Sequence, residues 1–140
     1  MYLLDTDHLS VLERGGAESQ RLRRRLQAVS PDEVAATVVS YEEQTRGWLG
    51  FLSKARSRDE HVTAYAYLQR HLQVFCAILL VAFDQTAAMI FQRLQQQRIR
   101  IGTMDLRIAS IALAHDATVL SRNSADFQQV PGLRVEDWTM

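Results

Sequence analysis

Short apolar runs alternate along the chain with longer stretches in which apolar residues recur at helical spacing. Such runs, bounded by turn-forming or polar residues, predict β-strands, and the helical spacing predicts amphipathic helices. Because strands and helices alternate, we expect a three-layer α/β/α sandwich with a mainly parallel central sheet. The predicted strands are residues 2–4, 34–39, 77–83, 117–120 and 133–135.

The helices are predicted from side chains that can accept a hydrogen bond at a helix start. Thr6 or Asp7, Ser40, Asp84 and Thr103 are the expected caps. The predicted helices run to residue 12, over 17–29, from residue 40 onward, over 58–75, from 84 to 97 and over 104–115. After the Ser40 cap we expect one buried stripe, made of Tyr41, Thr45, Trp48, Leu49 and Leu52.

The amino-acid composition limits the classes of protein to which this chain can belong. With 140 residues and 47% hydrophobic content, residues 1–140 are expected to form a single domain. The net charge of zero gives no global field that would attract nucleic acid, so such binding would need local patches. The single cysteine, Cys76, excludes an internal disulfide and is expected to be buried. No signal peptide or membrane-spanning run is visible, so we expect a cytoplasmic protein without a membrane partner.

Acidic side chains stand where the predicted strands end. Ligands of parallel α/β sheets bind beyond the carboxyl ends of the strands. Asp5 follows the first strand, Glu43 and Asp105 lie in first turns of helices, and Asn123 and Asp126 follow the fourth strand. Carboxylates gathered in one cleft repel each other unless a hard cation compensates their charge, and Mg²⁺ or Mn²⁺ suits oxygen ligands. The pattern therefore favours metal-dependent hydrolysis of phosphodiesters.

Each acid also has an ordinary structural interpretation. Ser40 and Glu43 have the spacing of a capping box, which is the preferred interpretation of that motif taken alone. Asp105 can serve only the helix dipole, and Asp5 can form a turn after its strand. The four histidines lack the spacing of a zinc site and are expected on the surface or in packing. Residue types and spacing leave both interpretations open.

Residues 3–10, with the sequence LLDTDHLS, resemble the opening of PIN-domain proteins, specifically the VapC toxins of bacterial toxin–antitoxin pairs. Further segments resemble the family in the same order along the chain. They are residues 40–47 with Glu43 as the acid, residues 83–88, the helix that begins near Asp105, and residues 121–138. The resemblance covers essentially the whole chain and implies a PIN-like fold.

The resemblance implies an endoribonuclease that requires Mg²⁺ or Mn²⁺, with Asp5, Glu43 and Asp105 as metal ligands and catalytic residues. Many members carry a fourth acid where this chain has Asn123. That catalytic role is then lost, taken by the amide oxygen, or moved to Asp126.

A second departure from the family concerns Asp7. The family commonly has asparagine at this position, so Asp7 can add negative charge near the site.

The resemblance also implies partners: an RNA substrate such as tRNA or rRNA, a VapB-like antitoxin whose C-terminal segment blocks the site, and a second copy in a homodimer. Arg46, Arg107 and Arg122 lie nearest the expected cleft. The basic segment 21–25 is interpreted at least as readily as a solvated face. Trp48, Tyr65 and Tyr67 are candidate partner contacts, although burial is the simpler expectation for aromatic side chains.

Two other functions compete. Asp5-Thr6-Asp7 after a strand also resembles haloacid-dehalogenase-type phosphatases, which need a lysine beside the phosphate. The only lysine, Lys54, lies before the expected position, which disfavours this class. The alternative is a catalytically weak PIN-like module that binds RNA or a partner without cutting, because Asn123 replaces the fourth acid.

Overall fold

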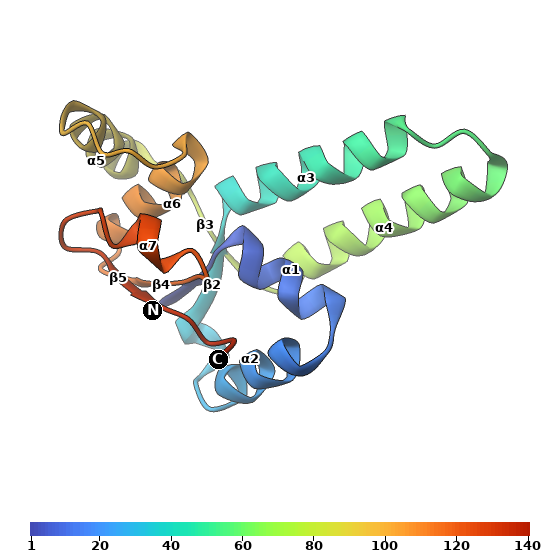
Figure 1. Ribbon diagram of the computed structural model, residues 1–140, viewed down its shortest axis with the longest axis horizontal. Helices are drawn as coiled ribbons and strands as arrows, with labels where there is room; N and C mark the ends of the chain where they lie inside the picture. The colour runs from blue at the N-terminus through green and yellow to red at the C-terminus, as the bar shows by residue number, and fades with distance from the viewer.

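All five predicted strands form in the computed structural model, which describes residues 1–140. They pair into one sheet in the order β3-β2-β1-β4-β5, and every pairing is parallel. This confirms the predicted α/β class with a parallel central sheet (Figure 1). The strands are β1 (Tyr2–Leu4), β2 (Val34–Thr37), β3 (Leu79–Val81), β4 (Thr118–Leu120) and β5 (Arg134–Glu136).

Helices cover both faces of this sheet (Figure 1). Successive strand residues point to opposite faces, so Leu3 joins the core formed with α5 and α6, whereas Leu4 joins the core formed with α1 and α2. The alternation produces the three layers. The helices are α1 (Thr6–Arg14), α2 (Ala17–Gln27), α3 (Val38–Ser53), α4 (Arg58–Cys76), α5 (Gln85–Gln96), α6 (Thr103–Ala114) and α7 (Ser124–Phe127), with a 3-10 turn η1 (Pro31–Glu33).

Helices α3 and α4 form a long hairpin that extends beyond the sheet (Figure 1). The stripe predicted to be buried along α3 is therefore covered mainly by α4. Leu49 is 48% exposed, and Trp48 is only half-buried. The prediction of a fully buried stripe is wrong because α3 leaves the sheet after its first turns.

The start of α3 lies two residues earlier than predicted. Val38 and Val39, expected as the end of a strand, form the first turn, and Thr37 is the cap. Packing of these β-branched residues against the core outweighs their strand preference. Asp84 caps α5 as predicted, its Oδ1 accepting from the Ala87 amide at 2.9 Å. Thr103 is not a cap, because α6 already begins at that residue.

Cys76 is exposed at the end of α4, so the expectation that it would be buried is wrong. It is the last residue of that helix and precedes the turn into the edge strand β3.

None of the helices combines the length and the apolar character needed to cross a bilayer.

Candidate metal centre

Asp5 lies at the carboxyl end of β1, where its backbone amide donates to the Leu120 carbonyl at 3.1 Å. Its side chain caps α1, with Oδ1 accepting from the His8 amide at 2.8 Å. The predicted caps of this helix, Thr6 and Asp7, are therefore wrong. Asp5 is only 4% exposed, and no lysine or arginine pairs with it. The structure thus holds a carboxylate in a fixed orientation at the end of a central strand.

The Glu43 side chain, on α3, lies at the carboxyl end of β1, where it contacts the first residue of α1. The Ser40 amide donates to Oγ1 of Thr37 at 3.1 Å, so the predicted Ser40–Glu43 capping box does not form. Glu43 Oε1 instead accepts from the Thr6 hydroxyl at 2.7 Å. Because Thr6 follows Asp5 in the chain, this hydrogen bond joins the second acid to the end of β1.

Asp105, Asn123 and Asp126 form a second connected group. The Asn123 side-chain nitrogen donates to Asp105 Oδ2 at 3.2 Å and to Asp126 Oδ2 at 3.0 Å. The opposite amide orientation would place its oxygen against two carboxylates, which disfavours it. The nitrogen of Asn123 therefore faces the acids and holds Asp126 beside Asp105.

The electrostatics connect these two groups. Burial raises the pKa of Asp5 to about 7, and the negative charges of Asp7 and Asp105 add to the rise. Burial also raises the pKa of Asp105, and the charges of Glu43 and Asp126 act in the same direction. Acids from four separate segments therefore share one field of negative charge. A hard divalent cation is the partner that best relieves it.

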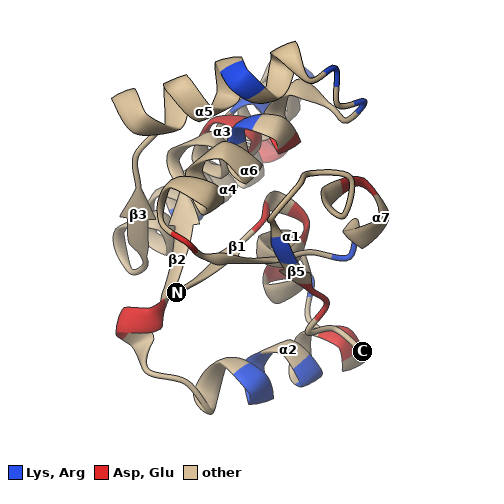
Figure 2. Cartoon of the chain, turned by 90° about the vertical axis from the view of Figure 1, so that its left-hand side faces the viewer, with Lys and Arg blue, Asp and Glu red and all other residues tan.

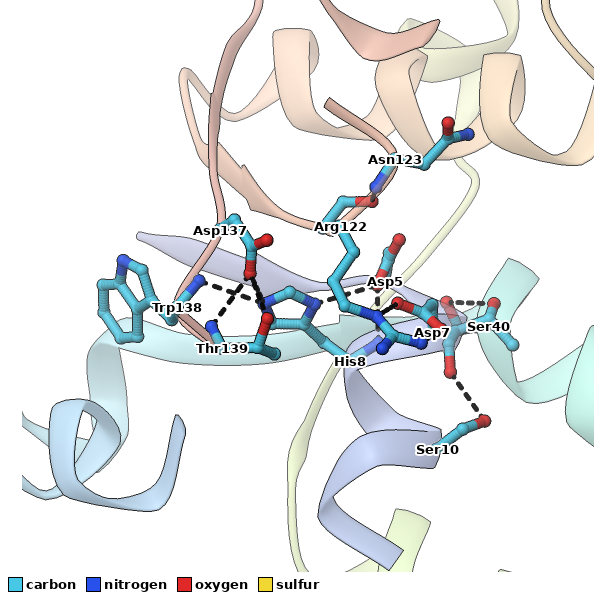
Figure 3. A network of polar contacts seen from close by, with 12 residues as sticks. Asp5, Asp7, His8, Ser10, Ser40, Arg122, Asn123, Asp137, Trp138 and Thr139 are labelled. Atoms are coloured by element: carbon cyan, nitrogen blue, oxygen red, sulfur yellow. Dashed lines mark hydrogen bonds and ion pairs between the residues drawn. The ribbon is translucent and has the colours of Figure 1, made fainter. Parts of the chain in front are cut away.

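Asp7 lies next to this field and is paired with Arg122. Arg122 donates to both of its carboxylate oxygens, at 2.6 and 2.7 Å (Figure 3). Arg122 also donates to Glu18 at 2.9 Å. The hydrogen bonds to Asp7 lower its pKa. The extra charge expected from Asp7 still acts on Asp5, but it is partly compensated by an arginine 115 residues away in the sequence.

Asp5, Asp7 and His8 also lie close enough to hold a metal ion, with ligand atoms within 4.8 Å of one another. This grouping competes with the set of acids from four segments. Since both oxygens of Asp7 accept from Arg122, binding a cation there would require that ion pair to break. The ligand atoms of Asp5, Glu43 and Asp105 do not all lie that close together, but this set has no ion pair to break and offers only oxygen ligands.

The arginines expected near the cleft are mostly engaged. Arg46 pairs with Glu42 at 2.6 Å, and Arg122 pairs with Asp7. Arg107 lies over the Phe91 ring, 5.4 Å from its centroid, and forms no ion pair.

The arginines of the basic segment of α2 are exposed, as the interpretation of a solvated face requires, but two of them also bind another part of the chain. Arg21 and Arg25 donate to backbone carbonyls of residues 139 and 137, so α2 holds the C-terminal segment (Figure 2).

Two site features escaped the sequence analysis. Thr6 was considered only as a cap, yet it holds Glu43. His8, expected on the surface or in packing, is completely buried beside Asp5, and burial lowers its pKa. Both roles could have been sought in the sequence, because Thr6 and His8 lie within one helical turn after Asp5.

Comparisons with known proteins support the fold, although no family model matches the chain. Ribonuclease VapC1 of Rickettsia felis is 26% identical over 136 residues, which cover 95% of this chain and 92% of that protein. A chain of VapBC-1 from nontypeable Haemophilus influenzae superposes with a TM-score of 0.79 at 20% identity, covering 99% and 98%. A chain of a toxin–antitoxin complex from Klebsiella pneumoniae gives 0.71 at 23%, also covering 99% and 98%. These matches run from end to end of the chain.

Proposed function

We propose that this chain, a homologue of the VapC ribonucleases, is an endoribonuclease toxin that hydrolyses RNA phosphodiester bonds with Mg²⁺ or Mn²⁺ and is neutralised by a VapB-like antitoxin. The observation that carries the proposal is the meeting of Asp5, Glu43, Asp105 and Asp126 in one field of negative charge at the carboxyl end of the sheet. We further propose that residues 1–140 work as one domain, because a single sheet organises both cores.

The residues present fit a divalent metal ion. Asp5, Glu43 and Asp105 would hold it, since they offer carboxylate oxygens and the buried Asp5 has no cationic partner. A bound Mg²⁺ or Mn²⁺ supplies a lower pKa for an attacking water and stabilises charge on the phosphoryl group.

The side chains around the acids fix their positions before substrate binds. Asp5 is held by the amide of His8, Glu43 by Thr6, and Asp105 by Asn123. Such preorganisation lowers the cost of orienting the reacting groups.

Asp126 is our proposal for the fourth acid. Asn123 occupies the position where a fourth acid is expected, but its amide holds the carboxylate of Asp126 beside Asp105. A binding module without catalysis remains the alternative, and it is favoured by the same substitution at Asn123.

RNA is the proposed substrate, with tRNA or rRNA as the class to test. Because the net charge is zero, attraction of the RNA backbone must come from local groups. Arg107, on the helix that carries Asp105 and without an ion pair, is the proposed phosphate contact.

The α3–α4 hairpin offers a surface for protein partners. Trp48, Phe51 and Tyr67 form an aromatic cluster with ring centroids 5.0 to 6.1 Å apart. Tyr65, on the same hairpin, is 58% exposed, contrary to the expectation that these aromatics would be buried. Exposed aromatic side chains are enriched in protein interfaces, so we propose this surface for the antitoxin. The homodimer implied by the resemblance is a further proposal.

The test is cleavage of labelled tRNA and rRNA by the purified, partner-free chain with Mg²⁺, with Mn²⁺ and with chelator. We expect discrete cuts that vanish with chelator and in Asp105→Asn and Glu43→Gln. The matched control is Glu42→Gln, one residue away on the same helix and paired with Arg46, which should cut normally. Cutting that survives chelation would contradict the metal requirement. An intact chain that binds Mn²⁺ but cuts none of these RNAs would favour the binding module.

A further inference from the structure

His8 occupies a place that its packing alone does not explain. It is completely buried between the end of β1 and the C-terminal segment. Its Nε2 accepts a hydrogen bond from the Trp138 amide at 3.3 Å, whereas its Nδ1 has no hydrogen-bond partner (Figure 3). Nδ1 lies 3.7 Å from Asp5 Oδ1. A buried polar atom without a partner is costly, so its direction toward a candidate metal ligand requires a reason.

The hydrogen bond to Trp138 determines which ring nitrogen carries the proton. A neutral imidazole that accepts at Nε2 has its hydrogen on Nδ1. Asp137 Oδ1 lies 3.7 Å from Nε2 but does not compete for this nitrogen. It already accepts from the amide and hydroxyl of Thr139, at 2.8 and 2.6 Å. The N–H of the His8 ring therefore faces Asp5.

We propose that His8 is a positioning residue for the metal centre, which orients the Asp5 carboxylate through its Nδ1–H; this inference rests on the proposed function. The backbone amide of His8 donates to Oδ1 of Asp5, and the Nδ1 atom of its ring lies 3.7 Å from the same oxygen. Rotation of the carboxylate is thereby restricted, and the Ser121 side chain is a further hydrogen-bonding neighbour of Asp5. Carboxylate ligands of metals are commonly held by such a second layer of hydrogen bonds.

The C-terminal segment belongs to this arrangement. The Trp138 ring packs on Tyr2 of β1 at 4.6 Å between centroids, and the Arg25 guanidinium lies 4.8 Å from the Trp138 ring centroid. These contacts hold the Trp138 amide that sets the tautomer of His8. The arginines of α2 thus act on Asp5 indirectly, through the C-terminal segment and His8.

The experiment measures Mn²⁺ affinity by titration calorimetry in the purified chain, with urea unfolding of each variant. His8→Asn places an amide near the Nδ1 position, and His8→Gln places one near Nε2. We expect His8→Asn to keep an affinity close to wild type and His8→Gln to lose roughly 10- to 100-fold. A purely structural role would instead make the affinity follow the unfolding free energy in both variants.

A second pair of variants keeps the inference testable if changes at His8 prevent folding. Trp138→Ala retains the backbone amide, whereas Trp138→Pro removes it. The proline variant should bind Mn²⁺ more weakly than the alanine variant. Equal affinities in this pair, or wild-type affinity in a folded His8→Gln chain, would overturn the role of His8. A wild-type chain that binds no Mn²⁺ would overturn the proposed metal centre itself.

Discussion

Replacing Asp5 by asparagine should stabilise the metal-free chain, although Asp5 is a candidate catalytic residue. Burial raises the pKa of Asp5 from 3.8 to about 7. The Asp5 carboxyl group therefore binds its proton more tightly in the folded state than in the unfolded state. The contribution of Asp5 to stability is therefore greatest below pH 4 and falls as the pH rises toward 7. The shift of about three pH units corresponds to a loss of at most about 4 kcal/mol.

Asparagine removes this loss without removing the cap. Its side-chain oxygen can accept the same hydrogen bond from His8, and asparagine caps helices as well as aspartate does. The assay is urea unfolding of wild type and Asp5→Asn from pH 4 to pH 8 in chelator. The two should be equal near pH 4, and Asp5→Asn should be more stable by up to about 4 kcal/mol at pH 8. A difference that does not change with pH would show that the titration of Asp5 is not its cause.

Further variants separate the other parts of the site. Asn123→Asp should lose about 1–3 kcal/mol in chelator, because it replaces two donors by a charge, yet bind Mn²⁺ on the order of tenfold more tightly by calorimetry. Asp7→Asn should leave Mn²⁺ affinity unchanged, since Arg122 occupies both oxygens of Asp7. Asp7→Asn should also lower the free energy of unfolding by roughly 0.5–1 kcal/mol at pH 7, because it removes the ion pair with Arg122. That ion pair lowers the pKa of Asp7, so the difference between wild type and variant should disappear when the pH falls below the ordinary pKa of Asp7 and the carboxylate is protonated. Tyr65→Ala should weaken binding of the proposed VapB-like antitoxin by on the order of tenfold in a pull-down titration, while RNA cleavage by the free chain is unchanged.

The sequence predicts the sheet well because a short apolar run between amphipathic stretches rarely forms anything other than a buried strand. All five strands appear, although the run over 34–39 ends two residues early and the run over 77–83 shrinks to Leu79–Val81. The caps are less predictable. Asp5, Thr6 and Asp7 are all suitable caps, and only the point at which β1 stops pairing with β4 selects Asp5.

The site is predictable in its residue types but not in its contacts. Acids at strand ends follow from topology, since parallel strands bring their carboxyl ends to one edge. The pair of Asp7 with Arg122 joins residues 115 positions apart, and no local pattern marks it. The link from Trp138 to His8 spans 130 positions and depends on where the C-terminal segment packs. Long-range polar contacts of this kind arise from the fold rather than from the local sequence.

We propose that Asp5, Glu43 and Asp105 together hold one divalent cation. Anomalous diffraction from crystals of the chain soaked in Mn²⁺, collected at the manganese absorption edge, tests it most directly. We expect a peak in contact with the carboxylates of Asp5 and Asp105, with Asp7 still paired to Arg122. A peak held by Asp7 and His8 instead, or no peak at a concentration that supports RNA cleavage, would contradict it.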